Sequence, residues 1–123
     1  MKNAINWFEI PVKDIQKAKS FYESILGAEM QIMEAMGMKT AFFPADLENG
    51  FIGGCIMEGQ GYEPSSKGAI VYLNGGEDLS VPLSKVEAAG GKVVLPKTSL
   101  GPNGYMAHFV DTEGNKVGFH SMK

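Results

Sequence analysis

Three side chains in the sequence are able to do acid-base or metal chemistry if the fold brings them together: Glu9, His108 and His120. An imidazole titrates near neutral pH, so a carboxylate that fixes its tautomer would make it a general base. Two imidazoles and one carboxylate are also a ligand set for iron, zinc or manganese. Alternatively, Glu9 is a polar group that has a hydrogen-bonding partner only because a buried carboxylate needs one.

Both histidines lie in the segment 104–120, which must position them. Strand-forming residues flank a short turn rich in Asp, Gly and Asn in this segment, a pattern that predicts a β-hairpin. Alternation along a strand puts Met106 beside His108 on one face, and Gly118 beside His120 on one face of the second strand. We therefore expect the two histidines to point the same way, unless a bulge in the turn changes the register.

Composition limits the class of protein and its partners. The chain has 123 residues, of which 44% are hydrophobic and 20% charged, enough for the core of one globular domain. Its net charge is −3 and all 11 basic residues are lysines, which disfavours nucleic acid as a partner. Cys55 is a lone cysteine, and no stretch is apolar enough for a signal peptide or a membrane span. We expect a cytoplasmic protein without a membrane partner.

The first half of the chain predicts the order βαβββ. A strand is expected over residues 6–12, with Trp7 and Glu9 on one face. Asp14 is a good N-cap for an amphipathic helix that stops at Gly27. Three further strands are expected over residues 29–33, 39–44 and 51–57.

The second half repeats this order after a polar connection. We expect a strand over residues 69–73, a helix that ends at Gly91, and a strand from Lys92, before the hairpin. Asp78 stands as far before Gly91 as Asp14 does before Gly27, which indicates an internal repeat of about sixty residues. A proline suits only the first turn of a helix, so Pro82 favours a helix start at Ser80 over one at Asp78.

Three stretches of the sequence resemble, in their order and spacing, the vicinal oxygen chelate superfamily: IPVKDIQKAKSFYESILG, KVEAAGGKVV and FVDTEGNKVGFH. The superfamily includes glyoxalases, bleomycin- and fosfomycin-resistance proteins and extradiol dioxygenases. The resemblance implies an α+β fold in which two tandem βαβββ modules form an open, funnel-like β-barrel cavity. It covers one domain over residues 1–123, with module one at 4–57, a linker at 58–68 and module two at 69–122.

The resemblance also implies where a metal would bind. In metal-dependent members of the superfamily, the first and last strand of each module supply one ligand each. The aligned positions fall near Trp7, at or near Cys55, at Ala69 and at Gly118. Three of these residues cannot ligate a metal, and a single thiol is a poor substitute for a hard-ligand site. We expect the usual metal site to be lost, with an indole at one side of the cavity and a gap at Gly118.

These observations predict a glyoxalase- and bleomycin-resistance-like protein that lacks the metal tetrad and binds a small apolar or aromatic molecule. The expected ligand-binding residues are Trp7, Cys55, Met57, Val71, Met106 and Gly118. The alternative is an enzyme, either a lyase or isomerase of the glyoxalase kind or a dioxygenase-like protein. It would use Glu9, His108 and His120 as acid-base groups or as a displaced divalent-metal site, and no other cofactor is expected. The resemblance implies a homodimer, with the modules paired within one chain or exchanged between chains.

Overall fold

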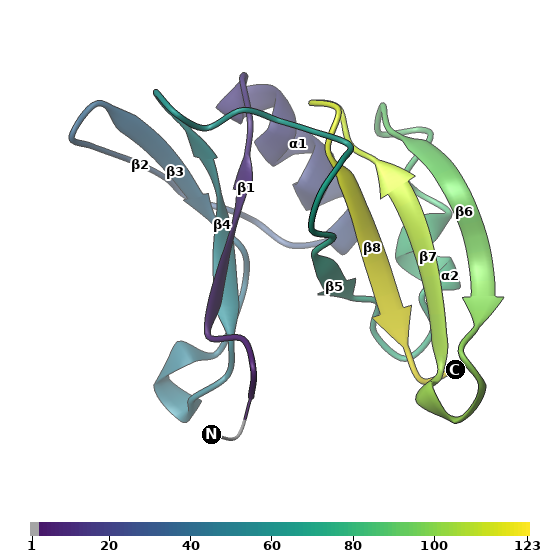
Figure 1. Ribbon diagram of the computed structural model, residues 1–123. Coiled ribbons are helices and arrows are strands. Elements are labelled where there is room, and N and C mark those ends of the chain that lie inside the picture. Colours follow the sequence, from purple (N-terminus) through teal and green to yellow (C-terminus); the bar gives the residue numbers. More distant parts are fainter. Residues whose placement is uncertain (1–2) are drawn as a thin grey trace.

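The computed structural model describes residues 3–123 and contains two modules with the same order of elements (Figure 1). The elements of module one are β1 (Trp7–Pro11), α1 (Ile15–Leu26), β2 (Ile32–Ala35), β3 (Met38–Phe42) and β4 (Gly53–Glu58). The elements of module two are β5 (Tyr72–Asn74), α2 (Ser80–Leu83), β6 (Lys92–Ser99), β7 (Tyr105–Val110) and β8 (Lys116–Ser121). The α+β class and the repeated βαβββ order are confirmed.

Each module forms its own four-stranded mixed sheet. Sheet A has the strand order β1-β4-β3-β2 and sheet B the order β5-β8-β7-β6. In both sheets the first strand pairs in parallel with the last strand of its module, and the other pairs are antiparallel. Residues 59–71, which connect the sheets, contain neither helix nor strand. Among the described residues, no helix has the length and apolar character needed to cross a membrane.

Helix α1 begins and ends where the sequence predicts. The Asp14 side chain accepts a hydrogen bond from Lys17 N at 3.1 Å, which satisfies one of the free amides of the first turn. Gly27 has a φ of 65°, a left-handed conformation that other residues adopt at a cost, and its amide donates to Glu23 O. Five apolar or aromatic side chains of α1 are buried: Ile15, Ala18, Phe21, Tyr22 and Ile25.

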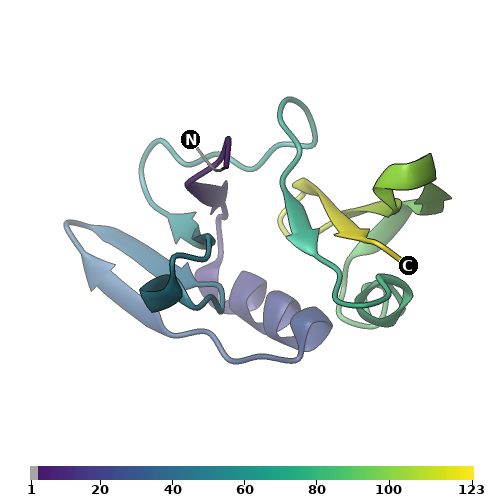
Figure 2. The same cartoon turned by 90° about the horizontal axis from the view of Figure 1, so that it is seen from below.

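The buried face of α1 joins the two modules through one hydrophobic core. The Tyr22 ring lies 5.2 Å from that of Phe43 in module one, and the Phe21 ring lies 5.9 Å from that of Phe109 in module two. Buried residues of both sheets belong to the same cluster, including Ile56 of β4. Figure 2 shows α1 at the bottom of the view, with the sheets spreading to either side. One side of each sheet therefore packs on this core, and the other side points away from it.

The second helix is shorter than its apolar spacing predicts. Regular helix covers only Ser80–Leu83, and turns follow as far as Gly90. Pro82 has no amide hydrogen, and beyond it Lys85 N donates to Pro82 O while Gly91 N donates to Val86 O, so the spacing of the backbone bonds is mixed. The predicted helix start at Ser80 is confirmed, and the predicted regular helix up to Gly91 is wrong.

Two predicted strands are displaced along the chain. The strand expected over residues 29–33 lies at Ile32–Ala35, because it forms a hairpin with β3 and runs up to the turn at Met36 and Gly37. The strand expected over residues 69–73 is reduced to Tyr72–Asn74. Only these three residues pair with β8, so the strand begins close to its last predicted residue.

Candidate functional site

The two histidines lie on the same side of sheet B. In the register of β7 and β8, Met106 is opposite His120 and His108 is opposite Gly118. The pairing runs without a shift from one end of the hairpin to the other. Opposite residues of an antiparallel pair share a face, so the predicted common orientation of the histidines is confirmed.

We use the name face A for the side of sheet A that points away from α1. Glu9 is opposite Cys55 across β1 and β4, and Trp7 is opposite Gly53, so the position beside Cys55 is held by Glu9 and not by Trp7. The indole of Trp7 is 38% exposed, and its ring lies 6.2 Å from that of Phe42 in an edge-on arrangement. Face A comprises Trp7, Glu9, Phe42, Cys55 and Met57.

The sulfur atoms of face A lie deep in the sheet. Cys55 and Met57 are buried, and the Thr40 hydroxyl donates to the Met57 sulfur at 2.9 Å. Burial, and next the charge of Glu9, raise the pKa of the Cys55 thiol to about 11. The thiol is therefore protonated at neutral pH and does not act as a nucleophile there.

Glu9 has a partner that comes from the connection between the modules. The hydroxyl of Tyr62 donates to Glu9 Oε1 at 2.9 Å. This bond, together with the charge of Glu9, raises the pKa of Tyr62 above its ordinary value. A loop aromatic thus covers part of face A, a contact that no local pattern in the sequence indicates.

We use the name face B for the side of sheet B that points away from α1. Tyr72 of β5 and His108 of β7 both lie opposite Gly118 of β8, and Tyr72 Oη lies 2.6 Å from His108 Nε2. His120 Nε2 donates to the carbonyl oxygen of Asn103 at 2.7 Å. In β5, β7 and β8, face B comprises Tyr72, Asn74, Met106, His108, Val110, Lys116, Gly118 and His120.

The gap expected at Gly118 is filled by an aromatic ring. A Cβ atom at this position would lie 2.5 Å from the Cδ1 and Cε1 atoms of Tyr72, so the ring rests directly on the glycine. Tyr72 is one of the site residues that the sequence prediction missed, together with Phe42, Tyr62 and Asn74. The only local signal for Tyr72 was its place in a predicted strand, one residue away from the expected ligand-binding residue Val71. Val71 itself packs against the core, and its carbonyl oxygen accepts from Gly118 N.

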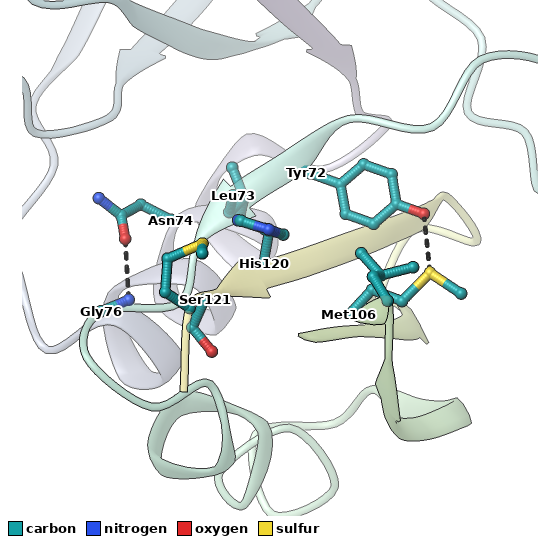
Figure 3. Close-up of a pocket in the computed structure, with 9 residues that line it drawn as sticks. Tyr72, Leu73, Asn74, Gly76, Met106, His120 and Ser121 are labelled. Atoms are coloured by element: carbon teal, nitrogen blue, oxygen red, sulfur yellow. Dashed lines mark hydrogen bonds between the residues drawn. The ribbon is translucent and has the colours of Figure 1, made fainter. Parts of the chain in front are cut away.

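Face B also borders an open pocket of about 690 Å³ at the end of β8 (Figure 3). Tyr72 and Met106 lie on one side of this pocket, with the Tyr72 hydroxyl 3.6 Å from the Met106 sulfur, and His120 lies between them and Asn74. The remaining lining residues are Leu73, Gly76, Leu100, Ser121 and Met122. The pocket is therefore lined by apolar and sulfur-bearing side chains, with a few polar groups.

The structure separates the residues that the sequence grouped as one site. Glu9 lies on sheet A, whereas His108 and His120 lie on sheet B, and each has a different hydrogen-bonding partner. Within residues 3–123, no three His, Cys, Asp or Glu side chains come together closely enough to hold a metal ion. Glu9 therefore does not orient either imidazole within one chain.

The environment of His108 predicts its protonation state. Partial burial, and next the charge of Lys116, lower the pKa of the imidazole from its ordinary value of 6.5. We expect His108 to be neutral at pH 7 and to titrate with a midpoint below 6.5, as measured from the imidazole NMR signals. The chain has 2 histidines, so a His120→Gln variant assigns the remaining signal. A midpoint above 6.5 would contradict this environment.

The fold and these two faces define a small α+β protein built from a duplicated βαβββ module. Aromatic, imidazole and sulfur-bearing side chains lie on the sides of the sheets that point away from α1. The chain belongs to the Glyoxalase/Bleomycin resistance protein/Dioxygenase superfamily, whose model matches residues 4–119. A glyoxylase-like domain-containing protein of Didymella fabae is 31% identical over 119 residues, which are 90% of this chain and 88% of the fungal protein.

Solved structures share the fold at lower identity. A glyoxalase I mutant of Zea mays has a TM-score of 0.73 and 23% identity over 94% of this chain, which spans only 45% of the maize chain. TnmS3, an antibiotic binding protein from Streptomyces, has a TM-score of 0.68 and 22% identity, with coverage of 100% and 99% of the two chains. The fosfomycin resistance protein FosX from Listeria monocytogenes has a TM-score of 0.64 and 19% identity, with coverage of 100% and 93%.

Proposed function

We propose that the protein binds a small apolar or aromatic molecule and does so without the metal tetrad of the family's metal-dependent members. The observation that carries this proposal is the exposure of large aromatic side chains on both outer faces. Trp7 and Phe42 on face A are 38% and 37% exposed, and Tyr72 on face B is 44% exposed. Aromatic groups gathered on an uncovered face favour a ligand or a partner that buries them.

The donor atoms at the family's metal positions support the absence of the tetrad. In module two, Ala69 has no donor atom in its side chain, and neither has Gly118, on which the Tyr72 ring rests. In module one, the buried thiol of Cys55 has a raised pKa, whereas a coordinating thiol must lose its proton. Glu9 beside it is a single hard donor. This set does not fit an octahedral or tetrahedral metal site.

We further propose that the ligand is enclosed between two copies of the chain. Both faces point away from the core that α1 forms with the sheets, so neither covers the other within one protomer. A two-fold homodimer in which face A of one protomer meets face B of its partner would close two equivalent sites. It would also bury the exposed rings of Trp7 and Tyr72. This arrangement corresponds to the exchanged pairing of modules.

The description of one structural neighbour is consistent with a protein that binds its ligand without catalysing a reaction. TnmS3, whose chain is covered almost completely, is described as an antibiotic binding protein. The present chain has lysines but no arginine, which disfavours a strongly anionic ligand that needs a planar fork of donors. An uncharged aromatic compound is the ligand class that these features support best.

A lyase or isomerase is the second candidate, favoured by two polar pairs on the faces. Tyr62 is hydrogen bonded to Glu9 on face A, and Tyr72 to His108 on face B. In the proposed dimer, a carboxylate from one protomer and an imidazole from its partner would line the same site. Proton transfer next to a carbonyl needs such a base, together with a donor for the developing oxyanion. A displaced metal site at Glu9, His108 and His120 would likewise require both protomers.

Mixing two variants tests the shared site. Trp7→Ala removes the indole of face A and Tyr72→Ala removes the ring of face B, and each is expected to weaken binding of 2-naphthol at least about tenfold. An equimolar mixture forms heterodimers in which one site keeps both rings, so about a quarter of the sites should regain native affinity. Isothermal titration calorimetry measures the recovered stoichiometry, and light scattering after gel filtration measures the dimer.

A matched variant controls for loss of an aromatic ring elsewhere. Phe51 is exposed and lies in neither face, so Phe51→Ala should leave both affinity and dimerisation unchanged. A mixture that binds no better than its two components would contradict the exchanged site. Failure of the native dimer to bind 2-naphthol or any other member of a panel of bicyclic aromatics would contradict the proposed function.

A further inference from the structure

Tyr72 and His108 form a hydrogen-bonded pair that spans three strands of sheet B. Their strands, β5 and β7, are not neighbours, because β8 lies between them. Adjacent strands are about 4.8 Å apart, so the two backbones are separated by roughly 10 Å. Nevertheless Tyr72 Oη reaches to 2.6 Å from His108 Nε2. The contact crosses the face of the middle strand.

The glycine in the middle strand makes this contact possible. Gly118 is in register with Tyr72 on one side and with His108 on the other. Any larger side chain would occupy the place of the Tyr72 ring, since a Cβ atom would lie 2.5 Å from Cδ1 and Cε1 of that ring. The position at which the family resemblance expects a metal ligand therefore carries a tyrosine ring, whose hydroxyl is held by an imidazole.

We propose that Tyr72 and His108 together bind an oxygen atom of the ligand, a phenolic hydroxyl or a carbonyl oxygen on an aromatic body. This inference rests on the proposed function, because it names the class of ligand that the same face recognises. Tyr72 is 44% exposed, so the residue that carries this hydroxyl is accessible to a ligand. The aromatic body would lie over the adjoining pocket, against Leu100, Met106 and Met122.

The pair is suited to an oxygen atom because it can present either polarity. When Tyr72 donates its proton to His108 Nε2, the lone pairs of the phenolic oxygen accept a hydroxyl proton from the ligand. When the other tautomer of the imidazole donates to the phenolic oxygen, the Tyr72 proton can turn from the Met106 sulfur, 3.6 Å away, to a carbonyl oxygen of the ligand. A hydrocarbon ligand, which has no polar atom, satisfies neither arrangement.

A matched pair of probes and a matched pair of variants test this inference. The probes are 2-naphthol and naphthalene, which differ by one hydroxyl group. Tyr72→Phe removes the hydroxyl of the pair and keeps the ring on Gly118, so the affinity for 2-naphthol should fall about five- to tenfold. The affinity for naphthalene should stay within about twofold, because it makes no hydrogen bond. Tyr105→Phe, the same change in the same sheet, should leave both affinities unchanged.

A second variant tests whether the glycine positions the tyrosine. Gly118→Ala should displace the Tyr72 ring and reduce the affinity for 2-naphthol at least as much as Tyr72→Phe does. In the double variant that combines Gly118→Ala with Tyr72→Phe, the preference for 2-naphthol over naphthalene should be the same as in Gly118→Ala alone. The imidazole NMR spectrum of His108 should change in both single variants and not in Tyr105→Phe.

The outcomes distinguish this inference from the proposed function. Equal affinity of the native protein for the two probes, unchanged in Tyr72→Phe, would overturn the oxygen-binding pair and leave small-molecule binding intact. A preference for 2-naphthol that survives in Tyr72→Phe would also overturn it. If the native protein binds neither these probes nor any other aromatic compound, the proposed function fails and this inference fails with it.

Discussion

Replacing Asp111 with alanine is expected to lower the free energy of unfolding by about 3–5 kcal/mol, a large effect for a polar substitution. The Asp111 carboxylate is buried in the turn between β7 and β8. It accepts from the Tyr22 hydroxyl at 2.6 Å, from Asn115 Nδ2 at 3.1 Å, and from the amides of Glu113 and Asn115 at 2.8 and 2.9 Å. Alanine would leave the fully buried Tyr22 hydroxyl without an acceptor.

Urea unfolding followed by circular dichroism measures this effect, and two smaller changes separate its parts. Asp111→Asn keeps one oxygen acceptor and should cost less than Asp111→Ala. Tyr22→Phe removes the donor together with its need for a partner, and should cost about 1 kcal/mol. A loss below 1 kcal/mol in Asp111→Ala would show that the turn does not depend on this carboxylate. Burial and the neighbouring carboxylate of Asp111 also raise the pKa of Tyr22, so its hydroxyl stays protonated and keeps donating.

Replacing Phe21 with alanine is expected to destabilise both modules by about 3–5 kcal/mol, the range for a large buried aromatic side chain. Phe21 lies on α1 of module one, yet its ring packs against Phe109 of module two and approaches the backbone of Gly91. A Cβ atom at Gly91 would lie 2.8 Å from the Phe21 Cε1 atom, so the ring is held closely on that side. The cavity left by alanine would open the contact between the modules.

The chain offers a built-in reporter for this experiment. Its single tryptophan, Trp7, lies in β1, so fluorescence follows module one while circular dichroism follows the whole chain. Both signals should give one coincident urea transition at lower midpoint in Phe21→Ala, because the modules share a core. The exposed ring of Phe51 is the control, and Phe51→Ala should change the stability by less than about 0.5 kcal/mol. Separate transitions in the native protein would contradict the shared core.

Local patterns in the sequence were enough to predict helix α1 and the hairpin that carries the histidines. The caps at Asp14 and Gly27 determine α1, and the alternation of residues 104–120 determines the hairpin with its register. Both depend on residues that are close in the chain, where propensity and turn chemistry act directly. The repeated order of elements followed from the same short-range signals.

The candidate site was harder to predict because its contacts are long-range. Tyr72 meets His108 only through the pairing of three strands, and Glu9 meets Tyr62 only because the connection between modules returns over face A. Alternation assigned each side chain to a face, but it does not state which faces are turned toward each other. The sharing of α1 by both sheets decides that point, and it separates Glu9 from the histidines.

Alternate residues of strand β8 lie on opposite sides of sheet B, one facing the core and the other facing outward. Val117 and Phe119 are buried in the common core, whereas Gly118 and His120 lie on face B. Substitutions on the outward positions therefore leave the packing of the core in place. A duplicated scaffold of this kind can vary the side chains on its outer faces one residue at a time, while the same strand continues to hold the molecule together.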